Sequence, residues 1–269
     1  PAAAGPGTNA AAFLGLGFGA RPLGVGEAFV AMADDASALH YNPAGLALRP
    51  SAALMPDSRR YELLVTQALY LQGMSLSQMG FLARPFGVSF TNLRVSGLER
   101  RSTESESSEG TFGASDVAFA MSYARQVRGT GLGVTGRLIN ESIAGYSATA
   151  FAVDFGALRR LESLPLSWGV SVANLGTKVR FINESYSLPL TMRLGATAGL
   201  TKRFPHAISL ETDLTRDSAP VLRLGVEYLG FGPLALRAGY RTSTSAQRQA
   251  ILGKALGSTA SGLSEFYGL

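Results

Sequence analysis

The chain has 269 residues, of which 46% are hydrophobic and only 16% are charged, whereas a soluble globular domain usually carries about 25% charged residues. It contains no cysteine, which excludes disulfides, thiolate metal sites and a cysteine nucleophile. The net charge is only +5, from 24 basic and 19 acidic residues without a dense basic run, which argues against nucleic-acid binding.

The first fifty residues are rich in glycine and alanine and carry start signals for two short helices. Asp34 and Asp35 precede an apolar stretch, and their carboxylates suit the cap of a first helical turn. Asn42 suits a second cap, and Pro43 suits the first position of a helix, where its missing N–H costs nothing. No basic region of a signal peptide precedes them. We therefore expect residues 1–50 to be a mature N-terminal plug that needs a host fold.

From about residue 60 onwards, apolar and polar residues alternate, which predicts β-strands. In residues 221–228, Leu222 and Leu224 share one face of the expected strand. Arg223 and Glu227 share the other face. The polar faces contain mainly Gly, Ser, Thr and Arg, which is typical of strands with lipid on one side and a wet lumen on the other. The alternative is a water-soluble β-sandwich, whose outer face would usually carry more Lys and Glu.

The lengths of the connections add a second pattern. The predicted strands are 61–70, 75–84, 86–95, 116–127, 131–139, 146–157, 166–174, 190–202, 206–214, 220–229 and 233–241, with a further strand beginning near residue 261. The long connections are 96–115, 175–189 and 242–260, and the short ones are 128–130, 203–205 and 230–232. All the long connections fall on one side and the short ones on the other, as in transmembrane β-barrels.

No segment has the composition of a membrane-spanning helix. The longest apolar candidate, residues 63–83, contains several Gln and Ser residues and a central Gly, so it is too polar for about 20 residues of hydrocarbon-spanning helix. A closed barrel is the other structure that spans a bilayer, because it pairs every backbone group internally. We therefore predict an all-β, antiparallel transmembrane β-barrel over residues 51–269, with residues 1–50 inside its lumen.

Large aromatic residues gather near strand ends on the short-turn side. They are Tyr123, Trp168, Phe204, Tyr228 and Phe231. Their shared side resembles the aromatic girdle of a membrane interface. Ordinary strand-end aromatics are the alternative interpretation.

The inward faces of the expected barrel carry charged residues that can anchor the plug through ion pairs. These lumen-facing charges are Arg193, Glu211, Asp213, Arg223, Glu227, Arg237 and Arg241. A catalytic cluster is the alternative, but the chain lacks a Gly-x-Ser-x-Gly elbow and a phosphate-binding Gly-Lys-Ser/Thr motif. Its two histidines, His40 and His206, have no partner at metal-ligand spacing. We therefore expect no enzyme activity, no metal site and no cofactor.

Residues 19–47, with the sequence GARPLGVGEAFVAMADDASALHYNPAGLA, are similar to the N-terminal signature of the PorV/PorQ family. That family belongs to the FadL-like group of outer-membrane β-barrels. The sequences VANLG at 172–176 and RLG at 193–195 also resemble recurrent strand motifs of the PorV group.

The resemblance implies a barrel of about 14 strands with the N-terminal segment tucked into the lumen as a hatch. The corresponding hatch motif comprises Asp34, Asp35, Asn42, Pro43 and Gly45. The chain departs from the family near its end, where Phe266 and Tyr267 are not followed by a complete closing strand. We therefore expect the closing strands to be missing from this sequence.

The resemblance also implies a location and a function. PorV-like members are partners in protein secretion, so we expect a non-enzymatic component of a secretion or envelope complex in the bacterial outer membrane. FadL-like members instead carry hydrophobic compounds across that membrane. This alternative predicts an apolar pocket between hatch and wall, lined partly by Phe13, Leu14, Leu16, Phe18 and Phe29. The expected partners are outer-membrane lipid, a larger complex and, in the alternative, a hydrophobic small molecule, but no nucleic acid.

Overall fold

The strands of the structure lie almost entirely beyond residue 60. The computed structural model describes residues 9–48, 60–70, 73–99, 110–161, 163–181, 184–199, 205–216, 218–231, 234–242 and 265–267. Within these residues the protein is all-β, apart from short helical turns near its N-terminus. Phe204 and most of the predicted connection 242–260 lie outside the described residues.

The helical turns are the 3-10 turns η1 (Ala12–Gly15) and η2 (Pro43–Ala47) and the α-helical turns α1 (Ala20–Gly24) and α2 (Ala38–Tyr41). The strands are β1 (Tyr61–Leu69), β2 (Met74–Ala83), β3 (Phe86–Glu99), β4 (Thr111–Val127), β5 (Thr130–Ile143), β6 (Tyr146–Arg160), β7 (Leu166–Gly176), β8 (Val179–Phe181), β9 (Glu184–Tyr186), β10 (Thr191–Gly199), β11 (His206–Thr215), β12 (Val221–Phe231), β13 (Leu234–Arg241) and β14 (Glu265–Tyr267). The predicted strands agree with β1–β7 and β10–β13. However, β3 and β4 extend into the predicted connection 96–115, and the hairpin β8–β9 occupies part of 175–189, which was expected to be a loop.

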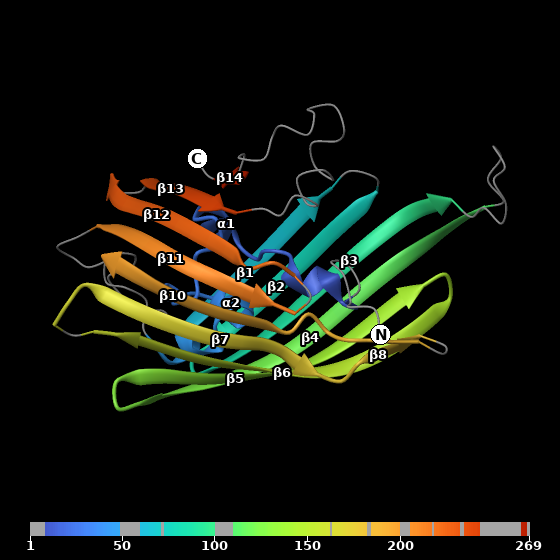
Figure 1. Cartoon of the computed structure of the whole chain (residues 1–269), viewed down its shortest axis with the longest axis horizontal. Coiled ribbons are helices and arrows are strands. Elements are labelled where there is room, and N and C mark those ends of the chain that lie inside the picture. Colours follow the sequence, from blue (N-terminus) through green and yellow to red (C-terminus); the bar gives the residue numbers. More distant parts are fainter. Residues whose placement is uncertain are drawn as a thin grey trace.

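Twelve strands form one sheet in the order β1-β2-β3-β4-β5-β6-β7-β10-β11-β12-β13-β14, and neighbouring strands are antiparallel. The sheet curls around the N-terminal helical turns, which lie on its concave side (Figure 1). Among the described residues, no hydrogen-bonded pair joins β1 to β14. The predicted all-β, antiparallel class is therefore confirmed, whereas closure of the sheet into a barrel stays a prediction.

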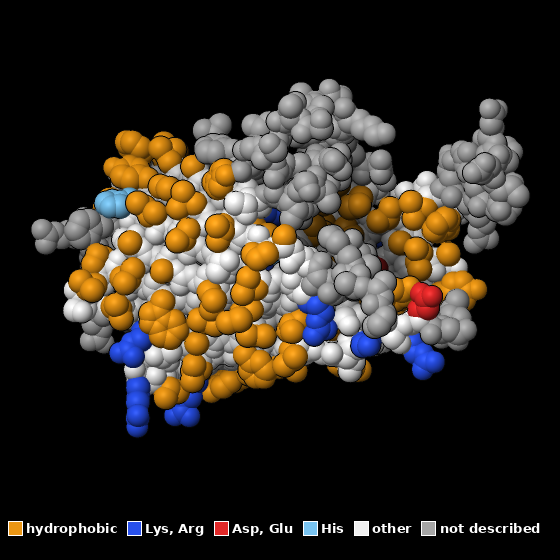
Figure 2. Space-filling model, in the orientation of Figure 1, with side chains coloured by type: hydrophobic (Ala, Val, Ile, Leu, Met, Phe, Trp, Pro, Cys, Tyr) orange, Lys and Arg blue, Asp and Glu red, His pale blue; other side chains and the backbone are white. Residues whose placement is uncertain are grey.

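The two faces of the sheet have the opposite polarity to those of a sheet in a water-soluble protein. On β12, Leu222 and Leu224 are 53% and 43% exposed on the outward face, whereas Arg223 and Glu227 between and beyond them are only 9% and 0% exposed. Figure 2 shows apolar side chains spread over the outward surface, with few charged groups among them. On β12 the alternation in the sequence thus separates an apolar outer face from a polar inner one.

The interior of the curled sheet contains two apolar clusters that join the N-terminal segment, residues 9–48, to the strands. The first contains Phe18, Phe29, Leu39, Leu46, Leu82 and Leu158 among others. The second contains Phe13, Leu14, Leu76, Ile139 and Val179 among others. The apolar core therefore forms where the N-terminal segment packs against the apolar part of the inner face, on strands such as β2, β5 and β6.

Candidate functional site

The most elaborate arrangement of polar groups lies between the N-terminal segment and the concave face of the sheet. Contact there is close because inward positions of several strands are glycines. A Cβ added to Gly225 would lie 2.6 Å from the Val25 carbonyl oxygen, and one added to Gly131 would lie 2.7 Å from the Ala44 carbonyl oxygen. The glycines on the polar faces of the alternation pattern thus make room for this segment.

Asn42 connects three parts of this interface. Its Oδ1 accepts a hydrogen bond of 3.1 Å from the Ala44 N–H, which caps η2 with Pro43 in the first turn. Its Nδ2 donates to the carbonyl oxygens of Val30, at 2.9 Å, and of Ala157 on β6, at 3.1 Å. The side chain is fully buried. The capping prediction for Asn42 and Pro43 is confirmed, and the structure adds two anchoring bonds to it.

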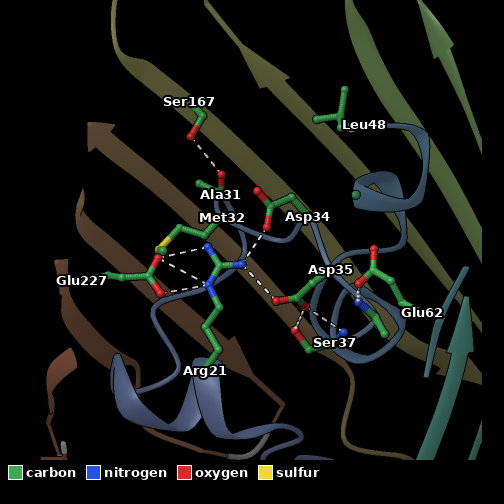
Figure 3. Close-up of polar contacts among 12 residues, drawn as sticks. Arg21, Ala31, Met32, Asp34, Asp35, Ser37, Leu48, Glu62, Ser167 and Glu227 are labelled. Atoms are coloured by element: carbon green, nitrogen blue, oxygen red, sulfur yellow. Dashed lines mark hydrogen bonds and ion pairs between the residues drawn. The ribbon is translucent and has the colours of Figure 1, made fainter. Parts of the chain in front are cut away.

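Arg21 on α1 is the centre of a buried ion cluster (Figure 3). Its guanidinium pairs with Asp34 at 2.6 Å, with Asp35 at 2.9 Å and with Glu227 on β12 at 3.0 Å. Arg237 on β13 also pairs with Glu227, at 2.7 Å. The carboxylates of Asp34 and Glu227 are inaccessible to solvent, so the cluster ties the N-terminal segment to the wall from inside.

Asp34 is not a helix cap, and this part of the prediction is wrong. Its second carboxylate oxygen pairs with Arg160 at the end of β6, at 2.6 Å, so its charge is matched by two arginines. Asp35 accepts hydrogen bonds from the N–H and the hydroxyl of Ser37 just before α2. Ser37 itself is the cap residue of α2 and makes no capping bond through its side chain.

A second ion cluster surrounds Glu27. Its carboxylate pairs closely with Arg223, and with Arg241 at 3.3 Å. Arg223 also pairs with Asp213 at 2.8 Å, and Arg193 lies 3.9 Å from the same carboxylate. Burial raises the pKa of Glu27, but Arg223 and then Arg241 lower it more, so the net pKa is below the usual value. Glu27 is therefore a charged carboxylate of the N-terminal segment that pairs with arginines of the strands.

Two further residues of the strands and their turns, Glu211 and Arg84, hold the backbone of the N-terminal segment. Glu211 accepts hydrogen bonds of 2.7 Å from the N–H groups of both Phe29 and Val30. Arg84, at the end of β2, donates to the carbonyl oxygens of Gly45 and Leu48 at 3.0 and 2.6 Å and pairs with Glu62 at 2.8 Å. The sequence prediction missed Arg84, Glu62 and Arg160, because their partners lie in distant parts of the chain.

The predicted lumen-facing charges all lie on the side of the N-terminal segment. Arg193, Glu211, Asp213, Arg223 and Glu227 are buried there. Arg237 and Arg241 are half-buried and pair with Glu227 and Glu27. Gly45 of the predicted hatch motif packs against the backbone of Ala33.

A cavity of about 630 Å³ lies between the N-terminal segment and the strands β7 and β10–β13. Leu14, Leu16 and Leu23 contribute apolar surface, and Arg193 and Asp213 contribute charge. Within the described residues, Arg193 Nη1 and Asp213 Oδ1 are buried without a hydrogen-bond partner. The site thus combines apolar surface with unsatisfied polar groups.

The apolar pocket expected from the sequence is formed only in part. Leu14 and Leu16 line the cavity. Phe13 and Leu14 belong to the second apolar cluster, and Phe18 and Phe29 belong to the first. The three phenylalanines are at most 3% exposed, because they fill the contact between segment and wall instead of facing open space.

Within the described part of the chain, no set of three His, Asp or Glu side chains is placed to hold a metal ion. His40 packs edge-on against Tyr41, with ring centroids 4.8 Å apart. Burial, followed by the charge of Arg193, lowers the pKa of His40 to about 3, so this ring is neutral.

Among the described helices, none combines the length and the apolar character needed to cross a membrane.

No protein-family model matches the chain, and no curated protein matches it significantly. The resemblance to the PorV/PorQ family therefore rests on residues 19–47, 172–176 and 193–195 alone.

Proposed function

We propose that this protein is a bacterial outer-membrane β-barrel with a plugged lumen, and that it serves as a non-enzymatic partner in a secretion or envelope complex, as PorV-like proteins do. The inverted polarity of the sheet carries the proposal. Outward residues such as Leu210, at 60% exposed, and Phe151, at 62%, would be unfavourable in contact with water and favourable in contact with lipid. The inward faces of the same two strands carry buried, ion-paired carboxylates, Asp213 and Asp154.

The anchoring of the N-terminal segment favours a partner function over an open pore. Two ion clusters and the bonds of Asn42, Glu211 and Arg84 hold the segment against strands on several sides of the sheet. Opening the lumen would separate these ion pairs and the backbone hydrogen bonds together, so we expect the plugged state to be the resting state.

The second candidate is a channel for hydrophobic small molecules, and the cavity favours it. Its volume of about 630 Å³ lies within the range of about 300–1,000 Å³ that small-molecule sites occupy. Leucines beside Arg193 would suit a ligand with both apolar and polar parts.

Purification from native membranes in mild detergent tests the partner function. The expected result is a defined larger complex that contains the protein together with the same additional chains in several detergents. Recovery of the protein alone in every detergent, together with uptake of a hydrophobic dye into proteoliposomes, would favour the channel instead.

A further inference from the structure

The outward surface changes from apolar to basic at the end of the sheet where the β4–β5 and β6–β7 turns lie. Along β4, the outward residues Phe119, Met121 and Tyr123 are followed by Arg125. Along β6, the outward Phe155 is followed by Ala157 and then by Arg159 at the next two outward positions. Figure 2 shows basic side chains projecting at this end, beside the apolar surface. An apolar belt therefore ends in a row of arginines.

Three arginines lie at this end of the sheet, and we name them the basic rim: Arg125, Arg128 and Arg159. All three are exposed. Arg128 lies in the β4–β5 turn, and Arg159 Nη2 reaches to 4.0 Å from where a Cβ on Gly129 would sit. The guanidinium of Arg159 thus lies beside the residue that follows Arg128.

The basic rim has no partner within the described part of the chain. None of its side chains forms an ion pair or hydrogen bond there, whereas the neighbouring Arg160 pairs with Asp34 on the inward side. The carboxylate of Glu62, near the same end, is likewise engaged by Arg84. Among the described residues, the rim therefore presents three positive charges without an acidic partner.

Apolar and aromatic residues adjoin the rim on the same outward face. In the register of the sheet, Arg159 faces Trp168 on β7, and Arg125 faces Leu132 on β5. Trp168 is 38% exposed and Leu132 is 46% exposed. Tryptophan and arginine at this depth are placed to meet a lipid headgroup while the apolar residues meet its acyl chain.

We propose that the basic rim binds the phosphate headgroups of anionic phospholipids in the leaflet that surrounds the short-turn end. The inference rests on the membrane location proposed above and adds a lipid specificity and an orientation to it. Each basic residue near an anionic lipid surface contributes about 1 kcal/mol, so about a fivefold preference is expected per arginine. A phosphate held by two or three guanidiniums is a recognised use of arginine.

Reconstitution in nanodiscs that contain phosphatidylcholine and phosphatidylglycerol tests the proposal. After mild extraction, native mass spectrometry counts the lipids that stay bound. The wild type should retain phosphatidylglycerol in preference to phosphatidylcholine. The triple variant R125Q/R128Q/R159Q should lose that preference, whereas R125K/R128K/R159K, which keeps the charge, should largely retain it.

The matched control is R94Q/K178Q/R180Q, which removes three exposed basic residues from the opposite end of the sheet. It should bind lipid as the wild type does. Equal retention by the R125Q/R128Q/R159Q variant and the wild type would overturn the inference, as would displacement of the lipid by millimolar inorganic phosphate. If the protein enters nanodiscs without lipid preference, only this inference fails. If it enters no bilayer, the proposed membrane location fails as well.

Discussion

Replacing Asn42 by alanine should release the N-terminal segment while leaving the sheet folded. Loss of the cap on η2 costs about 1 kcal/mol. The structure adds two buried bonds, to the carbonyl oxygens of Val30 and Ala157, and each such bond contributes about 1 kcal/mol net. The expected total is about 3 kcal/mol, which raises the population of the released state about a hundredfold.

Dye efflux from proteoliposomes and hydrogen exchange report this release. The Asn42→Ala variant should leak faster than the wild type, and the amides of Met32 and Gly45, which are bonded within the segment, should exchange faster. A variant lacking residues 1–47 sets the upper limit of efflux.

Asn140→Ala is the matched control, because Asn140 bonds Thr149 on the exposed side of neighbouring strands and does not contact the segment. If Asn42→Ala and Asn140→Ala show the same efflux and exchange, or if deletion of 1–47 does not increase conductance, the segment is not a plug.

Three further predictions concern the same interface. Glu227→Gln removes the common partner of Arg21 and Arg237 and should lower the free energy of unfolding in detergent by about 3 kcal/mol or more, whereas Glu184→Gln, on the exposed hairpin β8–β9, should not change it. Gly133→Ala places a Cβ against the backbone of Pro43 and should lower the free energy of unfolding, measured in urea, by about 1–3 kcal/mol. In the control Gly136→Ala, on the same strand, the Cβ points into open space, and the free energy should change by no more than about 0.5 kcal/mol. Equal effects of the two variants would show that the segment does not pack against β5. His40 has a pKa of about 3 in the folded protein, below its ordinary 6.5, so the unfolded chain takes up the proton first; stability should fall by up to about 1.4 kcal/mol per pH unit as the pH drops from 6.5 towards 3, and a His40→Gln variant that keeps the same slope between pH 6.5 and 4.5 would contradict this cause.

The strands could be predicted because successive residues alternate between the apolar outer face and the inner face of the sheet. Arg223 and Glu227 alternate with Leu222 and Leu224, and this pattern needs no knowledge of distant contacts. The hairpin β8–β9 has only three residues per strand, which is too short for an alternation to show. The sequence pattern therefore predicts a loop at these residues.

The candidate site was less predictable, because it depends on pairs that are far apart in the sequence. Aspartate is a preferred residue at helix caps, but Asp34 pairs with Arg160, 126 residues away. Arg84 lies in a turn that gives no indication of its bonds to Gly45 and Leu48. Asn42 was correctly predicted, because its capping bond to Ala44 is local.

The membrane location of the outward face is the central claim, and the chain offers a direct probe of it. Trp168 is the single tryptophan and is 38% exposed on that face near a strand end. Its fluorescence in proteoliposomes should be quenched by brominated phospholipids, more strongly when the bromines lie near the headgroup than near the acyl-chain ends, and should be shielded from aqueous iodide. The account would be contradicted if iodide but not brominated lipid quenched the Trp168 fluorescence, and if the protein stayed monomeric without detergent.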